Sequence, residues 1–177
     1  LRLSSAASDV YKRQLIRFYN PIGFWLLLWP GLWGLFLSDN FNIENFTIVV
    51  LGSFLTRSLG CAINDFLDRD FDKSVERTKN RPIASKELSL SEAGIFIVLL
   101  ASVCIFLLMQ TNPYTIKLVS YVAIPMIILY PLMKRFLAMP QLFLGATFGL
   151  SLPISYSIAE STFCLLYTSD AADDSRS

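Results

Sequence analysis

The sequence predicts an all-α fold, namely a multi-spanning transmembrane helix bundle. One observation is composition: the 177 residues are 54% hydrophobic, 14% aromatic and only 16% charged, and the mean hydropathy is +0.51. A second is that the apolar residues form continuous runs, close to the length of about 20 residues that crosses the hydrocarbon core as a helix. A third is that these runs do not alternate apolar with polar residues, as the strands of a membrane β-barrel do.

Five apolar segments are candidates for spanning helices. In chain order, we expect them at residues 22–38, 46–62, 93–109, 116–133 and 142–158. Some of these segments are short for a span, so we expect the helices to continue into their flanks. Gly145 and Gly149 form a GxxxG pattern in the fifth segment, which is typical of close packing between membrane helices.

The loops between these segments alternate in their content of basic residues. The first loop (39–45) and the third loop (110–115) contain no lysine or arginine, whereas the second contains six and the fourth contains two. Those eight residues are Arg69, Lys73, Arg77, Lys79, Arg81, Lys86, Lys134 and Arg135. Because cytoplasmic loops are enriched in Lys and Arg, we predict an integral membrane protein, in a bacterial inner membrane. Its N-terminal side, second loop and fourth loop are predicted to face the cytoplasm.

The two ends of the chain differ from the segments between them. Residues 4–14 read SSAASDVYKRQ, residues 164–174 read CLLYTSDAADD, and neither stretch shows helical or strand periodicity. One transposon-type DNA adapter, translated from its two strands, encodes both. We therefore predict non-native tails at residues 1–14 and 164–177, and a truncated transmembrane domain at residues 15–163. The alternative is a disordered polar terminus.

The residue inventory excludes several kinds of site. The chain has no histidine, which excludes Ser–His–Asp and Cys–His triads and histidine-ligated zinc. Cys61 and Cys104 lie in apolar segments and Cys164 lies in the second tail, so neither a disulfide framework nor a metal pattern is present. There is no glycine-rich phosphate loop. The net charge of +1 gives no reason to expect a nucleic-acid partner.

An aspartate cluster follows the second apolar segment. If that helix continues for a few turns, Asn64, Asp68 and Asp72 lie on one face, with Asp65 at the edge of the face and Asp70 pointing away. Like charges at this spacing repel one another, and a hard cation would make the arrangement favourable. The spacing therefore indicates a Mg²⁺ site (Mn²⁺ is an alternative), with a diphosphate as the partner of the metal. The alternative is a solvated face of mixed charge.

Basic residues near this cluster support an anionic ligand. Lys79 and Arg81 follow in the same loop, and such side chains neutralise phosphate. Arg57 lies seven residues before Asn64 within an apolar segment, and a charged residue in a span is a candidate functional residue. The alternative for Arg57 is a structural ion pair with the aspartates.

Longer motifs add a family resemblance. NDFLDRDFD resembles the NDxxDxxxD signature of the UbiA-type intramembrane prenyltransferases. NPIGFWLLLWPGLWGLF, RSLGCAINDFLDRDFDKSVERTKNRPIASKELSLSEA and YPLMKRFLAMPQLFLGATFGLSLPISY resemble the first, second, and fourth to fifth spans of that family. Together these stretches cover most of residues 15–163. GC-x-x-ND, TKNRP and YPLMKR are most similar to the branch of the family that acts on 4-hydroxybenzoate in ubiquinone biosynthesis.

The resemblance implies a bundle with about five of the family's nine helices, and a Mg²⁺-dependent reaction. A polyprenyl diphosphate ionises at its allylic C–O bond, and the ring of 4-hydroxybenzoate attacks the carbocation ortho to its hydroxyl group and then loses a proton. An apolar cavity in the lipid bilayer would accept the prenyl tail and exclude water.

The matched motifs also imply residue roles. Three residues would bind the metal and the diphosphate, namely Asn64, Asp68 and Asp72, with Asp65 as a supporting catalytic residue. Two basic residues would help to hold the diphosphate, namely Lys79 and Arg81. The carboxylate of the aromatic acid is assigned to Arg135, with Lys134 as the second candidate, and Arg17 and Asn20 would line the cytoplasmic mouth. The alternative for Lys134 and Arg135 is a positive-inside anchor.

The chain departs from the family pattern near Ser161. The family has a second aspartate-rich motif after its fifth span, and the acidic run of the predicted tail is no substitute for it. We therefore expect the parent protein to be a prenyltransferase and this polypeptide to be inactive. Two other classes stay open: an aromatic or tetrapyrrole prenyltransferase of the same superfamily with another acceptor, and a non-enzymatic membrane protein that binds or transports a cation.

Overall fold

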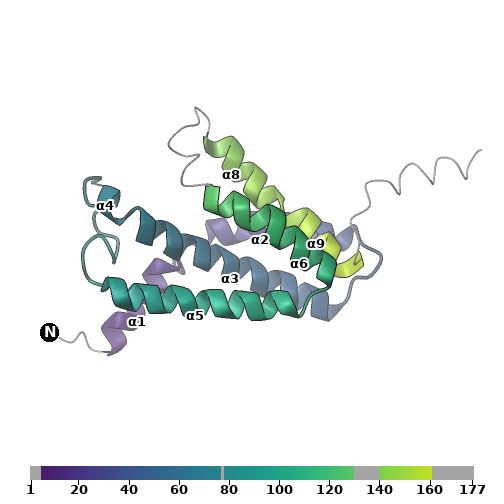
Figure 1. The fold of residues 1–177 in the computed structure, drawn as a ribbon, viewed down its shortest axis with the longest axis horizontal. Coiled ribbons are helices and arrows are strands. Elements are labelled where there is room, and N and C mark those ends of the chain that lie inside the picture. Colours follow the sequence, from purple (N-terminus) through teal and green to yellow (C-terminus); the bar gives the residue numbers. More distant parts are fainter. Residues whose placement is uncertain (1–4, 77, 130–139, 161–177) are drawn as a thin grey trace, which may run out of the picture.

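The computed structural model describes residues 5–76, 78–129 and 140–160, and the regular secondary structure in this part of the chain is helical throughout. Figure 1 shows the arrangement. In chain order the elements are α1 (Ser5–Leu15), α2 (Ile22–Phe36), α3 (Ile43–Leu67), α4 (Arg69–Asp72), α5 (Leu90–Met109), α6 (Pro113–Leu118), the π-helical turn η1 (Val119–Ala123), α8 (Pro140–Gly149) and α9 (Ser151–Glu160). The predicted all-α class is confirmed.

The helices match the predicted apolar segments in order. Three helices of the described part are long and apolar enough to cross a membrane: Ile43–Leu67, Leu90–Met109 and Gln141–Glu160. Two shorter apolar helices, Ile22–Phe36 and Pro113–Leu129, correspond to the first and fourth predicted segments, whose residues 130–133 lie outside the described part. The chain is thus an integral membrane protein with three candidate spans.

Polar caps move two helix starts away from the apolar runs. α3 begins at Ile43 and α5 at Leu90, both earlier than the predicted segments at 46 and 93. The side-chain oxygen of Asn42 accepts a hydrogen bond from the Asn45 amide at 2.7 Å. Ser89 and Glu92 form a reciprocal capping box before α5. Because a cap satisfies the free amides of the first turn, a helix starts at its cap and not at its first apolar residue.

A helix also forms where the sequence showed no periodicity. α1 covers Ser5–Leu15 and packs against α3. Its last residue, Leu15, is fully buried in an apolar cluster with Ala62, Ile83, Leu88 and Ala93. Tertiary packing at one end therefore fixes a helix that has no apolar stripe of its own. The non-native origin of residues 1–14 stays a prediction.

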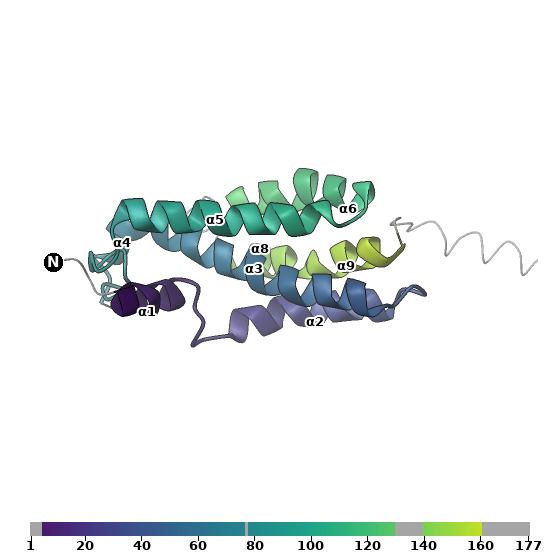
Figure 2. The same ribbon diagram turned by 90° about the horizontal axis from the view of Figure 1, so that it is seen from below.

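The bundle has two chemically different ends. α2 packs against both α3 and α9, α3 packs against α5, and α6 contacts α9 and α5. Figures 1 and 2 both show α1, α4 and the start of α5 at one end, with the α2–α3 and α5–α6 turns at the other. We call the first end the ionic end, because it holds Asp65, Asp68, Asp72 and Arg81.

Glycines bring α2 close to its neighbours. A Cβ at Gly31 would lie 2.8 Å from the Ser151 hydroxyl oxygen and 3.0 Å from a methyl group of Val49. A Cβ at Gly34 would collide with the Leu152 carbonyl oxygen and the Ser155 hydroxyl group. Small residues allow close approach in membranes, where helices gain no hydrophobic advantage by leaving lipid.

The GxxxG interpretation of the fifth segment is wrong for the described part of the chain. A Cβ at Gly145 or Gly149 would meet no described atom within 4 Å. The spacing shows only that small residues lie on one face of the helix. It does not show that another helix lies against that face, and here the closely packed glycines are those of α2.

The end opposite the ionic end is held by hydrogen bonds. The Asn112 side-chain amide donates to the Ser157 carbonyl oxygen at 2.6 Å, and the buried Thr115 and Ser157 hydroxyl oxygens lie 2.8 Å apart. The Glu160 carboxylate accepts a hydrogen bond from the Asp39 amide at 2.8 Å. These contacts tie the turn after α2 and the start of α6 to the end of α9.

We expect Gly34→Ala to lower the free energy of unfolding by about 1–3 kcal/mol, because the added methyl group meets a backbone carbonyl that cannot easily move. Thermal unfolding in detergent, followed by circular dichroism, measures this. Gly60→Ala is the matched control, because its Cβ meets no described atom within 4 Å. Equal destabilisation by both variants would contradict a specific α2–α9 contact.

Candidate active site

The aspartate cluster lies where α3 ends. α3 stops at Leu67, Asp68 is its C-terminal cap, and the single turn α4 follows. The Asp68 amide donates to the Asn64 carbonyl oxygen at 2.9 Å, and the Asp72 amide donates to the Asp68 carbonyl oxygen at 2.8 Å. Backbone hydrogen bonds between residues four apart therefore link Asn64, Asp68 and Asp72 across the break between α3 and α4.

The aspartates differ sharply in burial. Asp65, Asp68 and Asp72 are 1%, 8% and 7% exposed, whereas the Asp70 side chain is 68% exposed. Asp70 accepts a hydrogen bond from the Lys73 ammonium group at 2.8 Å, and this bond lowers the pKa of the Asp70 carboxyl. Three carboxylates thus face the interior, and the fourth belongs to the solvated surface.

Two arginines partner the most buried aspartate. Arg17 Nη2 lies 2.8 Å and 3.1 Å from the two carboxylate oxygens of Asp65, and Arg81 Nη1 lies 3.0 Å from Asp65 Oδ1. The same Arg81 nitrogen donates to Asp72 Oδ2 at 2.7 Å. The network therefore joins the segment after α1, the end of α3, α4 and the following loop. Sequence reasoning gave Asp65 only a supporting role and did not detect this network.

Arg17 has an unusual backbone conformation. Its φ is 57°, in the left-handed region that most side chains avoid. The residue ends the turn after α1 and directs its guanidinium group to a carboxylate 48 residues further along the chain. A strained backbone persists where surrounding contacts hold it, and here the Asp65 ion pair is such a contact. No local sequence signal predicts this pairing.

Asn64 carries the buried polar atom that most needs an explanation. Its Oδ1 is buried and has no hydrogen-bond partner among the described residues. A buried acceptor without a partner is costly, unless a ligand supplies the missing contact. No group of three or more Asp, Glu, Cys or His side chains in the described part is already arranged around a metal. The oxygen donors of Asn64, Asp68 and Asp72 are of the type that Mg²⁺ prefers.

The loop after α4 carries the predicted phosphate-binding residues. Thr78 is buried, and its hydroxyl group donates to the Asp72 carbonyl oxygen at 3.1 Å. Ile83 and Leu88 anchor the loop in the apolar cluster with Leu15. Arg81 therefore faces the aspartates, whereas Lys79 pairs with exposed Glu76. Of the two predicted loop cations, the structure brings only Arg81 to the aspartate cluster.

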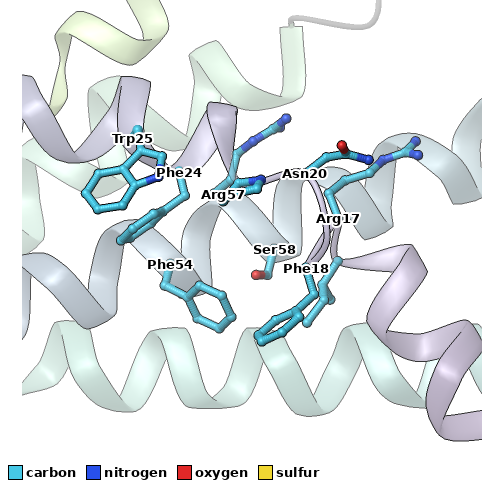
Figure 3. A pocket seen from close by; sticks show the side chains of 10 residues that line it. Arg17, Phe18, Asn20, Phe24, Trp25, Phe54, Arg57 and Ser58 are labelled. Carbon is cyan, nitrogen blue, oxygen red and sulfur yellow. The ribbon is translucent and has the colours of Figure 1, made fainter.

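A cavity of about 250 Å³ lies beside this network, between α2 and α3. Figure 3 shows Arg17, Asn20 and Arg57 pointing to one side of it, with Phe18 and Phe54 on the other side. Its further lining includes Phe24, Trp25 and the buried Ser58. The cavity thus combines guanidinium and amide donors with aromatic walls.

Arg57 is the cation of this cavity that has no carboxylate partner among the described residues. The side chain lies over Gly23, where any Cβ would collide with the guanidinium group, and its Cζ is 6.0 Å from the Phe148 ring centroid. The alternative ion pair between Arg57 and the aspartates is therefore not found in the described part. Lys134 and Arg135 lie outside the described residues, so their predicted roles stay predictions.

The fold and the site define a helical integral membrane protein with buried carboxylates and guanidinium groups gathered at one end. Comparison with known proteins gives its family. The model of the UbiA prenyltransferase family matches residues 27–171, and the chain belongs to this family.

Individual relatives agree with this assignment. The chain is 45% identical over 145 residues to a 4-hydroxybenzoate octaprenyltransferase of Polynucleobacter asymbioticus, a match that covers 81% of this chain and 50% of that protein. It is also 45% identical to the 4-hydroxybenzoate octaprenyltransferase of Pasteurella multocida, again with 81% and 50% coverage. The chain thus spans about half the length of these curated relatives.

A solved structure has the same fold. A UbiA homolog from Archaeoglobus fulgidus, bound to GPP and Mg²⁺, matches with a TM-score of 0.68 and 18% sequence identity. The match covers 92% of this chain and 58% of the archaeal chain. The predicted family and helix bundle are therefore confirmed.

We expect Asp65→Ala to lower the free energy of unfolding by about 3 kcal/mol, because it leaves two partly buried guanidinium groups without their shared partner. Unfolding of the chain in mixed micelles, titrated with a denaturing detergent, measures the change. Asp70→Ala is the matched control, and we expect no measurable effect because that side chain is solvated. Equal stability of the two variants would contradict the claim that the ion pairs of Asp65 stabilise the fold.

Proposed function

We propose that this chain is part of a Mg²⁺-dependent enzyme that transfers a polyprenyl group from polyprenyl diphosphate to the ring of 4-hydroxybenzoate. The observation that carries the proposal is the buried, unpartnered oxygen of Asn64, four residues before buried Asp68 and eight before buried Asp72. Similarity to 4-hydroxybenzoate octaprenyltransferases supports the choice of substrates.

Asn64, Asp68 and Asp72 would hold the metal through their side-chain oxygens. The unpartnered Asn64 acceptor and the two buried carboxylates fit a hard divalent cation. When bound, Mg²⁺ neutralises negative charge that develops on the diphosphate leaving group. The archaeal homolog was solved with Mg²⁺ and GPP, which supports this ligand pair for the fold.

The basic residues of the loop would bind the diphosphate. Arg81 already faces the aspartates, and Lys79 lies two residues earlier in the same loop. In the reaction the allylic C–O bond breaks and the diphosphate keeps the electron pair. The ring carbon ortho to the hydroxyl group then forms the new C–C bond, and its proton leaves to solvent or to a base. Fixed cations next to the leaving oxygen stabilise this charge separation.

The cavity between α2 and α3 would receive the aromatic acid. Arg57 is available for its carboxylate, since no described carboxylate pairs with it, and Asn20 and Ser58 supply polar contacts. The rings of Phe24 and Phe54 supply walls for a flat ligand. Arg135, with Lys134 as the second candidate, remains the residue that the resemblance assigns to the same carboxylate.

The orientation of the chain is part of the proposal. Arg17, the aspartates and the basic loop lie at the ionic end, which fits a cytoplasmic position under the positive-inside rule. A soluble aromatic acid would then enter from the cytoplasm, while the prenyl tail stays in the bilayer.

We expect a chain extended to the length of the curated relatives to prenylate 4-hydroxybenzoate in membranes, and to require Mg²⁺. Radiolabelled 4-hydroxybenzoate, extracted into an organic phase after prenylation, measures this. Asp68→Ala is expected to lower the rate at least about a hundredfold, whereas Asp70→Ala, on the solvated surface, keeps most of it. Transfer to another aromatic acceptor, but not to 4-hydroxybenzoate, would contradict the proposed substrate. Transfer to no acceptor would contradict the enzyme itself.

Arg57→Gln is expected to raise the KM for 4-hydroxybenzoate by about tenfold or more, because a charge-assisted hydrogen bond is lost. The KM for the prenyl donor should change much less. The test is to repeat the kinetics with 4-hydroxybenzamide, which lacks the carboxylate, because the penalty should largely vanish with it. A penalty of the same size for both acceptors would show that Arg57 acts on the fold or on the donor.

A further inference from the structure

We propose that Arg81 is a built-in counter-cation of the aspartate cluster, which a divalent metal ion must displace from Asp72 while Asp65 retains it. This inference rests on the proposed function, because it concerns how the proposed metal site is stabilised before the metal ion binds. It adds that the loop carrying Arg81 moves when metal binds.

The contacts of Arg81 carry the argument. A single guanidinium nitrogen, Nη1, lies 2.7 Å from Asp72 Oδ2 and 3.0 Å from Asp65 Oδ1. The Arg81 side chain is 20% exposed, the Asp72 side chain 10% and the Asp65 side chain 1%. Arg81 therefore bridges two shielded carboxylates and is shielded with them.

Two of the three buried carboxylates at this point are already paired without any ligand. Arg17 and Arg81 supply two positive charges, and Asp65 and Asp72 supply two negative charges. Buried charge is tolerated only when it is paired. These ion pairs therefore stabilise Asp65 and Asp72 before any metal binds.

Metal binding conflicts with one of these contacts. A divalent cation at the oxygens of Asn64, Asp68 and Asp72 would lie next to the Arg81 guanidinium group, and like charges in a shielded site repel strongly. Asp65 offers Arg81 a second carboxylate, which Arg17 holds in position. The geometry thus allows Arg81 to leave Asp72 without leaving the ionic end.

Two other cations of the described part of this region, Lys73 and Lys79, do not share this position. Lys73 pairs with Asp70 and Lys79 pairs with Glu76, and both carboxylates are on the surface. Loss of either lysine removes a positive charge nearby without uncovering Asp72. This difference separates a specific displacement from a general effect of loop charge.

The loop around Arg81 would report the displacement. The Arg81 amide donates to the Thr78 carbonyl oxygen at 3.0 Å, and the Thr78 hydroxyl group donates to the Asp72 carbonyl oxygen at 3.1 Å. Arg81 and Thr78 thus both connect this part of the loop to α4. Release of the Arg81 side chain from Asp72 removes one of these connections, while the Thr78 contact and the burial of Ile83 and Leu88 remain.

The first test is titration of the 177-residue chain in lipid nanodiscs with Mg²⁺ alone, followed by calorimetry. We expect Arg81→Gln to bind Mg²⁺ about tenfold more tightly than the unchanged chain, because no internal cation competes for Asp72. Lys73→Gln is the matched control, because Lys73 pairs with exposed Asp70, and it should change the affinity less than about twofold. Asp72→Asn should weaken binding in either background.

The outcomes are distinguishable. Equal tightening by Arg81→Gln and Lys73→Gln would show an effect of overall charge and overturn the proposal. Weaker binding by Arg81→Gln would show that Arg81 supports the metal site, and would also overturn the proposal. In both cases the metal site of the proposed function stands. Absence of Mg²⁺ binding in the unchanged chain and in every variant would instead overturn a metal site formed by Asn64, Asp68 and Asp72 alone, and this inference with it.

A second measurement does not depend on the fold of a variant. Hydrogen–deuterium exchange of the unchanged chain, with and without Mg²⁺, should show faster exchange of the amides in residues 78–88 when the metal is present. Arg81→Gln, if it folds, should show fast exchange in both conditions. Slower exchange on addition of Mg²⁺ would contradict release of the loop and overturn the proposal.

Discussion

The ionic end of the bundle depends on one constraint, the burial of the Asp65 carboxylate at the end of α3. A carboxylate that is 1% exposed needs cationic partners, and the chain supplies Arg17 from the segment after α1 and Arg81 from the loop after α4. Three segments that are separate in sequence are therefore fixed at one point. The position of Asp72 follows from the same network, because Arg81 holds both aspartates. In this way a structural ion pair sets the geometry of the candidate metal ligands.

The opposite end is built differently. Gly34 lets α2 approach the Leu152 backbone of α9, and Asn112 binds the Ser157 carbonyl oxygen at 2.6 Å. These contacts are neutral, and they suit a bilayer in which packing and hydrogen bonds, not the hydrophobic effect, hold helices together. Buried ion pairs thus gather where chemistry is proposed, while the opposite end is held by close packing and by hydrogen bonds, including one that the Glu160 carboxylate accepts. A substitution at one end should therefore perturb stability and function in a different proportion from a substitution at the other.

The sequence allowed prediction of the parts of the structure that arise from local pattern. The five apolar runs gave the helices in order, and the four-residue spacing of Asn64, Asp68 and Asp72 persists in the backbone. Helix starts were missed where a cap is polar, as at Ser89. The pairing of Arg17 with Asp65 was also missed, because no periodic pattern links residues 48 positions apart. The prediction that Gly145 and Gly149 pack closely against another helix failed for the same reason, because spacing does not show which helix lies against a given face.

A site that must bind a metal and a highly charged anion has to fold before either arrives. Exposed clusters of like charge repel, and buried ones are unstable without partners. In this chain the problem is resolved internally: the guanidinium groups that fit an anionic ligand also neutralise the aspartates that fit a metal. Under the proposed function, ligand binding would exchange partners among charges that are already shielded. Such an exchange requires that a metal ion compete for Asp72 more strongly than Arg81 does, and Asp72 is the more exposed of the two carboxylates that Arg81 bridges.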